Sequence, residues 1–125
     1  MSRRKIMLTI GQLAKKTGLT VRSIRWYEEN GIISPDAFNS SGHRLFDDDK
    51  IDWLFFVKHL RAAGLSVKEV HHYTQLILKG VETLPERLAI LTKAEETTIA
   101  EIEEKQRQLE HIRFKKSRYE LGENY

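Results

Sequence analysis

Hydrophobic positions follow a helical pattern along most of this chain. Apolar residues recur three or four positions apart, and a hydroxyl three residues before Glu or Gln marks a helix start at Thr9, Ser66 and Thr83. Glycines suited to left-handed helix ends follow several of these segments. Together the signals predict five helices, at residues 10–17, 20–30, 48–63, 67–79 and 84–120.

Residues 32–46 break the helical pattern. The two ends of this stretch are apolar, Ile32-Ile33 and Leu45-Phe46, and the middle is rich in Ser, Asn and Gly. Two short apolar segments around a polar turn are typical of a β hairpin. We therefore expect a small hairpin between the second and third helices.

The last predicted helix carries a heptad pattern. With Leu88 in an a position, the a and d positions are Leu88, Leu91, Glu95, Thr98, Ile102, Lys105, Leu109, Ile112, Lys116 and Tyr119. At about 1.5 Å per residue the helix would be roughly 55 Å long, more than the preceding residues could cover. Its apolar stripe is therefore predicted to pair with a second copy.

Charged residues in this stripe leave room for other arrangements. Glu95, Lys105 and Lys116 interrupt the apolar positions, which favours an antiparallel or offset pairing where each can meet an opposite charge. The alternative is a single helix that charge pairs keep in solution, or one that folds back on its own domain.

Composition narrows the class of protein. The chain has 125 residues, of which 40% are hydrophobic and 31% charged, with 7 Gly and 2 Pro, as in helical proteins more than in β sandwiches or disordered chains. This length excludes a large multi-domain enzyme. Cysteine is absent, which excludes disulfides, thiolate metal sites and cysteine catalysis and agrees with a reducing cytoplasm.

Positive charge is concentrated near the N-terminus. The formal net charge is +3, but residues 1–44 hold eight Lys and Arg against three Asp and Glu. This asymmetry predicts a polyanionic partner for the N-terminal part. The longest apolar runs, such as residues 53–57, are too short to cross a membrane, and the basic start lacks the apolar run of a secretory signal.

Residues 9–31 have the layout of a helix-turn-helix. Gly18 lies at the turn, and Thr20 is placed to cap the second helix. On that helix Arg22, Arg25 and Trp26 share the side opposite Val21 and Ile24, as expected for a surface that enters a major groove. The alternative is a merely solvated face, and for Tyr27 the core and a DNA contact stay equally open.

These residues resemble the winged helix-turn-helix of the MerR family of transcription regulators. The resemblance lies in Thr9-Ile10-Gly11-Gln12-Leu13-Ala14, in residues 20–33, in Gly42-His43-Arg44-Leu45-Phe46, and in residues 51–57 and 60–66. It implies a mainly α fold, with a winged helix-turn-helix domain and a small β hairpin wing at residues 1–80. A long dimerisation helix, paired with its copy as an antiparallel coiled coil, and a tail follow at residues 81–125.

The resemblance also implies a function and its residues. Such regulators bind pseudo-palindromic promoters as homodimers and distort the DNA so that RNA polymerase can use it. The positions that match the family, with their exposed neighbours on the second helix, predict DNA contacts at Thr20, Arg22, Ser23, Arg25, Trp26, Tyr27, His43 and Arg44. His43 replaces the usual wing Tyr, and Phe38 lies where many members have Arg. The residues Arg3, Arg4 and Lys5 would form either a mobile basic arm or a solubilising tail.

No effector can be named from these residues. The chain is similar to short members that respond to aldehydes and other electrophiles, but His59 stands where those carry a reactive cysteine, so thiolate sensing is not expected. A small apolar effector would have its pocket between the helix at residues 48–63 and the partner's long helix, among aromatic residues that otherwise belong to the core. The walls of this predicted pocket are Phe46, Trp53, Phe56, His59 and Tyr73.

Metal, cofactor and catalytic sites are not expected. The adjacent His71 and His72 point about 100° apart on a helix, so they do not form a chelating pair. Asp47, Asp48 and Asp49 favour a helix start, with no nucleophile and base placed beside them. The rival function is a coiled-coil protein-interaction module, such as a prophage assembly or adaptor protein, with only non-specific affinity for DNA.

Overall fold

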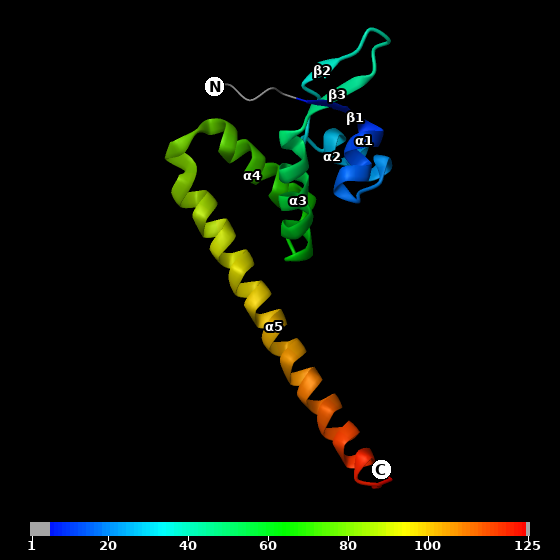
Figure 1. The fold of residues 1–125 in the computed structure, drawn as a ribbon. Coiled ribbons are helices and arrows are strands. Elements are labelled where there is room, and N and C mark those ends of the chain that lie inside the picture. Colours follow the sequence, from blue (N-terminus) through cyan, green and yellow to red (C-terminus); the bar gives the residue numbers. More distant parts are fainter. Residues whose placement is uncertain (1–5, 125) are drawn as a thin grey trace.

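The computed structural model describes residues 6–124 as a small winged domain followed by one long helix (Figure 1). Its elements in chain order are β1 (Met7–Thr9), α1 (Ile10–Thr17), α2 (Val21–Glu29), β2 (Ala37–Phe38), β3 (Arg44–Asp47), α3 (Asp49–Ala62), α4 (Val67–Lys79), η1 (Val81–Thr83) and α5 (Leu84–Glu120). The five predicted helices are confirmed, and none of their ends is displaced by more than one residue.

Two of the predicted helix starts are capping boxes. At α1 the Thr9 hydroxyl accepts the N–H of Gln12 at 3.2 Å, and the Gln12 carboxamide oxygen accepts the N–H of Thr9 at 2.9 Å. At α4 the Ser66 backbone N–H donates to the Glu69 carboxylate at 3.1 Å, and the Ser66 hydroxyl accepts the Glu69 N–H at 3.1 Å. The hydrogen bond from the Ser66 backbone N–H, and after it the interaction of the Ser66 side chain with the carboxylate, hold the pKa of the Glu69 carboxyl below its usual value.

The third predicted capping box, at Thr83, is wrong. The one-turn helix η1 precedes α5, and the Thr83 hydroxyl makes no cap bond. It donates instead to the carbonyl oxygens of Leu76 at 2.6 Å and Gly80 at 2.8 Å. Arg87 donates to the Thr83 hydroxyl at 3.1 Å. The hydrogen bonds of Thr83 thus link the start of α5 to the end of α4.

A three-stranded antiparallel sheet, in the order β1-β3-β2, joins the N-terminus to the hairpin. Leu8 pairs with Phe46, and Phe38 pairs with Arg44. The hairpin was predicted, but β1 was not, and the first apolar end of the hairpin was misplaced. The Ile32 N–H donates to the Tyr27 carbonyl at 2.9 Å, so Ile32 and Ile33 close the end of α2 and lie in the core outside the sheet.

The core lies between the helix-turn-helix, the sheet and the next two helices. Each of these parts, and the segment after α2, contributes large fully buried side chains, which are Leu13, Ile24, Ile32, Phe46, Leu54, Val57 and Val70. Because α1 and α2 both contribute to it, their orientation relative to α3 and α4 is set by packing. The exposed face of α2 is thereby held on a rigid support.

Helix α5 leaves this domain as a rod (Figure 1). Only its beginning packs on the core, through Ile90, Leu91 and Ala94. Farther along, it exposes large apolar side chains at Ile99, Ile102, Leu109, Ile112 and Tyr119. Among the described residues, no helix is long and apolar enough to span a membrane.

Candidate nucleic-acid interface

The turn between α1 and α2 is fixed by backbone and hydroxyl hydrogen bonds. Gly18 adopts φ 74° and its N–H donates to the Ala14 carbonyl at 2.9 Å, which closes α1. At the start of α2 the Thr20 hydroxyl accepts the Ser23 N–H at 3.0 Å and donates to the Ser23 hydroxyl at 2.9 Å. Thr20 and Ser23 therefore set where α2 begins and how it is aimed.

The two faces of α2 divide as the sequence predicted. Ile24 is buried in the core, whereas Arg22 and Arg25 are exposed. Tyr27 is only 7% exposed, so its ring packs in the core. The structure therefore shows the first alternative for Tyr27, a ring in the core. Contact of its hydroxyl with DNA stays a prediction.

Trp26 is held at the edge of the exposed face by a residue of α3. Its side chain is 43% exposed, and the Arg61 guanidinium lies 5.8 Å from the centre of its ring. The same Arg61 donates to the Leu65 carbonyl at 2.9 Å, which fixes it to the α3–α4 turn. Arg61 was not predicted as a site residue, yet it extends the basic surface of Arg22 and Arg25.

The tip of the wing is a turn built around Asn39. The Asn39 carboxamide oxygen accepts the N–H groups of Ser41 and His43, each at 2.9 Å, and the Asn39 N–H donates to the His43 carbonyl at 2.9 Å. His43 and Phe38 are both exposed. Phe38 therefore offers an apolar surface where the resemblance would place an Arg that contacts phosphate.

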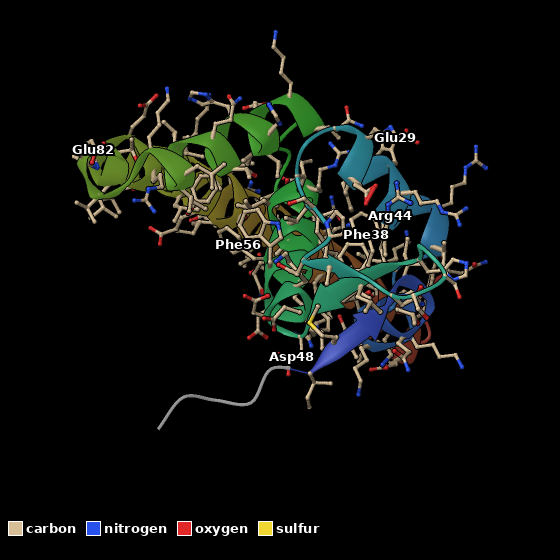
Figure 2. The ribbon with its side chains drawn as sticks, turned by 90° about the horizontal axis from the view of Figure 1, so that it is seen from above. Glu29, Phe38, Arg44, Asp48, Phe56 and Glu82 are labelled. Carbon is tan, nitrogen blue, oxygen red and sulfur yellow. The ribbon has the colours of Figure 1, made fainter. Side chains whose placement is uncertain are left out.

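Arg44 joins the wing to α2. Its Nε donates to both carboxylate oxygens of Glu28, at 2.7 and 2.8 Å. Figure 2 shows Arg44 on β3, on the side of the wing that faces α2. The pair links two parts of the interface, and Arg44 remains half exposed. Sequence reasoning missed Glu28, because a helix wheel gives no sign of a partner on a distant strand.

Replacing Glu28 by Gln should tighten DNA binding and barely change stability. The ion pair is partly exposed, so its loss should change the free energy of unfolding by less than about 1 kcal/mol. The freed Arg44 guanidinium can then contact a phosphate. Fluorescence anisotropy on a labelled duplex measures the affinity, and urea denaturation measures the stability.

A matched control for this variant is Glu29→Gln. It removes the same charge from the same helix, and the exposed Glu29 lies beside Arg22 and Arg25. A larger gain in affinity for Glu28→Gln than for Glu29→Gln would assign the difference to Arg44. Equal gains would contradict a DNA contact by Arg44.

The predicted DNA-binding residues come together in two groups. Thr20, Arg22, Ser23, Arg25 and Trp26 lie on α2, with Tyr27 mostly beneath the surface. His43 and Arg44 lie at the wing, and the Arg44–Glu28 pair connects the groups. The predicted basic arm, Arg3, Arg4 and Lys5, lies outside the described residues.

The predicted effector residues do not form one group. Trp53, Phe56 and Tyr73 form an aromatic row, with ring centres 5.9 and 5.8 Å apart (Figure 2 labels Phe56, which faces α4). Trp53 donates from Nε1 to the Ile32 carbonyl at 2.8 Å. Phe46 is instead fully buried beneath the sheet, and His59 is exposed near the end of α3.

An open groove of about 360 Å³ lies beside this row. Of the five predicted pocket residues Trp53 alone lines it, together with Ile32, Lys50, Ile77 and other residues of the surrounding elements. Within residues 6–124, no group of three or more His, Cys, Asp and Glu could hold a metal ion. His72 pairs with Glu86 at 3.2 Å, while His71 packs against Gly31.

Comparisons of the sequence agree with this architecture. The model of the MerR HTH family regulatory proteins matches residues 8–77. The HTH-type transcriptional regulator AdhR of Bacillus subtilis (strain 168) is 40% identical over 84 residues, which are 67% of this chain and 60% of AdhR. The match therefore spans less than two thirds of that relative's length.

Solved structures share the fold. HiNmlR, a MerR family regulator lacking the sensor domain and bound to promoter DNA, superposes with a TM-score of 0.81 at 24% identity, over 92% of this chain and 91% of that one. A MerR family transcriptional regulator from Bacillus thuringiensis gives 0.78 at 25% identity, over 91% and 100%. Since the family model covers more than half of its residues, this chain belongs to the MerR HTH family of regulatory proteins.

Proposed function

We propose that this chain is a transcription regulator that binds a pseudo-palindromic promoter as a homodimer and alters transcription by distorting the DNA. The observation that carries the proposal is the exposed pair Arg22 and Arg25 on α2, whose opposite face is anchored in the core by Ile24. A helix with its side chains is about 10–12 Å across and fits a major groove about 12 Å wide.

Each part of the interface has a separate task. Arg22 and Arg25 are placed to pair with guanine edges or to grip phosphates, while backbone N–H groups and the wing position α2 on the duplex. His43 and Arg44 at the wing would contact the sugar-phosphate backbone beside the groove. The excess of positive charge over residues 1–44 supports attraction to DNA before the specific contacts form.

The dimer would form through α5. This helix has 37 residues, none of them buried, and a stripe of exposed apolar side chains. We assign residues 1–80 to DNA binding and residues 81–125 to dimerisation. A two-fold axis through paired α5 helices presents two equal α2 helices to two half-sites, which accounts for a pseudo-palindromic target.

Regulation would act through the shape of the promoter. A dimer that holds both half-sites rigidly can bend and untwist the DNA between them, at an energy that depends on the sequence being deformed. RNA polymerase would then engage a promoter whose elements are otherwise misaligned. A small apolar effector, where one acts, would meet the aromatic row of Trp53, Phe56 and Tyr73 between α3 and α4.

Fluorescence anisotropy tests the proposal directly. The purified chain is titrated onto the duplex upstream of its own gene and onto a scrambled duplex, at near-physiological salt. A preference of about 10³-fold or more, as for specific DNA binders, supports the proposal. Equal, weak and salt-sensitive binding to both duplexes contradicts it and favours a coiled-coil protein-interaction module.

A further inference from the structure

Three charges interrupt the apolar stripe of α5, and two of them lie in its middle. Glu95 and Lys105 occupy a and d positions between Leu88 and Ile112, and both are exposed. Lys105 reaches only the Gln108 carboxamide at 3.2 Å, and Glu95 has no ion-pair partner among residues 6–124. A charge in a helix–helix seam is costly unless an opposite charge meets it. The two charges therefore limit how a second α5 can lie along this one.

Antiparallel helices allow few arrangements. The a positions of one helix face the d positions of the other, so two identical helices can shift only in steps of one heptad. Each shift changes every facing pair at once. The correct shift should therefore satisfy the charged and the apolar positions together.

We propose that two copies of α5 pair antiparallel with Glu95 opposite the partner's Lys105, a register that rests on the proposed homodimer. Identical helices make this ion pair twice. Three further seam pairs then bring uncharged side chains together: Leu88 faces the partner's Ile112, Leu91 the partner's Leu109, and Thr98 the partner's Ile102, while Lys116 near the helix end faces the partner's Leu84.

Shifted registers place charges against apolar side chains. A shift of one heptad in one direction sets Glu95 against the partner's Ile112 and Lys105 against the partner's Ile102. The opposite shift sets Lys105 against the partner's Leu88. Each of these arrangements sets Glu95 or Lys105 against an apolar side chain without an opposite charge, a cost that the proposed register avoids at these two positions.

An independent match occurs at the ends of the helices. In this register the partner's Lys116 is level with Leu84, so the partner's Tyr119 and Leu121 extend about 5–8 Å beyond the start of α5. There the corner between α4 and α5 exposes Leu78 at 82% and Val81 at 76%, and Leu121 is itself 77% exposed. The same register thus covers apolar side chains at both ends.

Disulfide trapping tests the register, because the chain has no cysteine of its own. Glu95→Cys and Lys105→Cys chains carrying different tags are co-expressed and oxidised. We expect a cross-linked heterodimer, and no cross-link when either variant is oxidised alone. The matched control co-expresses Glu95→Cys with Ile112→Cys, the facing pair of the neighbouring register. Cross-linking of the control pair instead of the first pair would overturn the proposal.

Charge exchange gives a second readout without oxidation. Glu95→Lys and Lys105→Glu should each weaken dimerisation about 10-fold or more in sedimentation equilibrium, since each places like charges together. The double variant should restore the affinity to within a few-fold of the unsubstituted chain. A double variant as weak as the single ones would overturn the register.

Promoter binding and the oligomeric state of the unsubstituted chain distinguish a failure of the proposed register from a failure of the proposed function. A dimer that binds its promoter duplex but traps the control pair has the proposed function and a different register. A monomer in sedimentation equilibrium would contradict the homodimer, and with it the register.

Discussion

Replacing Arg25 by Ala should weaken binding to the specific promoter duplex on the order of 10- to 100-fold, about 1–3 kcal/mol, and leave binding to a scrambled duplex nearly unchanged. The reason is geometric: Arg25 is exposed on α2, next to the buried Ile24 that fixes the helix. A guanidinium at this place can make a bidentate contact with guanine, and alanine cannot replace it. Fluorescence anisotropy on the two duplexes measures the difference.

Two comparisons make this result decisive. Arg107→Ala removes the same charge from the outer side of α5, where Arg107 pairs with Glu104, and should leave both affinities unchanged. If Arg25 grips a phosphate instead, Arg25→Ala will lower both affinities alike and reduce the salt dependence by about one contact. An unchanged affinity for the specific duplex would contradict α2 as the recognition helix.

The helices of this fold were predictable because their ends are set locally. The Thr9 and Ser66 boxes connect residues three apart, and Gly18 supplies its own left-handed conformation. Thr83 carried the same pattern, yet its hydroxyl bonds to Leu76, seven residues back. A pattern of residue types cannot show that a preceding one-turn helix redirects the hydroxyl.

The sheet depends on more distant partners. Strand β1 has three residues, too few to show an alternating pattern, and forms because β3 pairs with it. Ile32 and Ile33 have the composition of a strand, but the Ile32 N–H is used by the end of α2. Short strands are therefore decided by which backbone groups remain free, which only the folded chain determines.

The candidate site also combines features that the local sequence predicts with contacts that depend on distant residues. The exposed and buried faces of α2 follow from helical periodicity, so Arg22, Arg25 and Ile24 were placed correctly. The links that position this helix are long-range: Arg44 reaches Glu28 across sixteen residues, and Arg61 reaches Trp26 from α3. Such pairs form only once the elements are packed together, so the spacing of residues in the sequence does not predict them.

Replacing Gly31 by Ala should be among the most destabilising single changes in the winged domain. Gly31 adopts φ 72° directly after α2, and a Cβ there would lie 2.6 Å from the His71 ring of α4. The left-handed backbone costs about 1–2 kcal/mol for alanine, and the overpacking adds about 1–3 kcal/mol. Urea denaturation at a fixed protein concentration measures the free energy of unfolding.

Gly18→Ala separates the two costs of this substitution. Gly18 has nearly the same φ, 74°, but nothing lies within 4 Å of its Cβ position, so Gly18→Ala should show the backbone cost alone. In a His71→Ala background, Gly31→Ala should cost no more than Gly18→Ala, because the clashing ring is gone. If Gly31→Ala costs the same in both backgrounds, the His71 ring moves aside freely. The packing of His71 against the end of α2 would then not be what holds α2 in place.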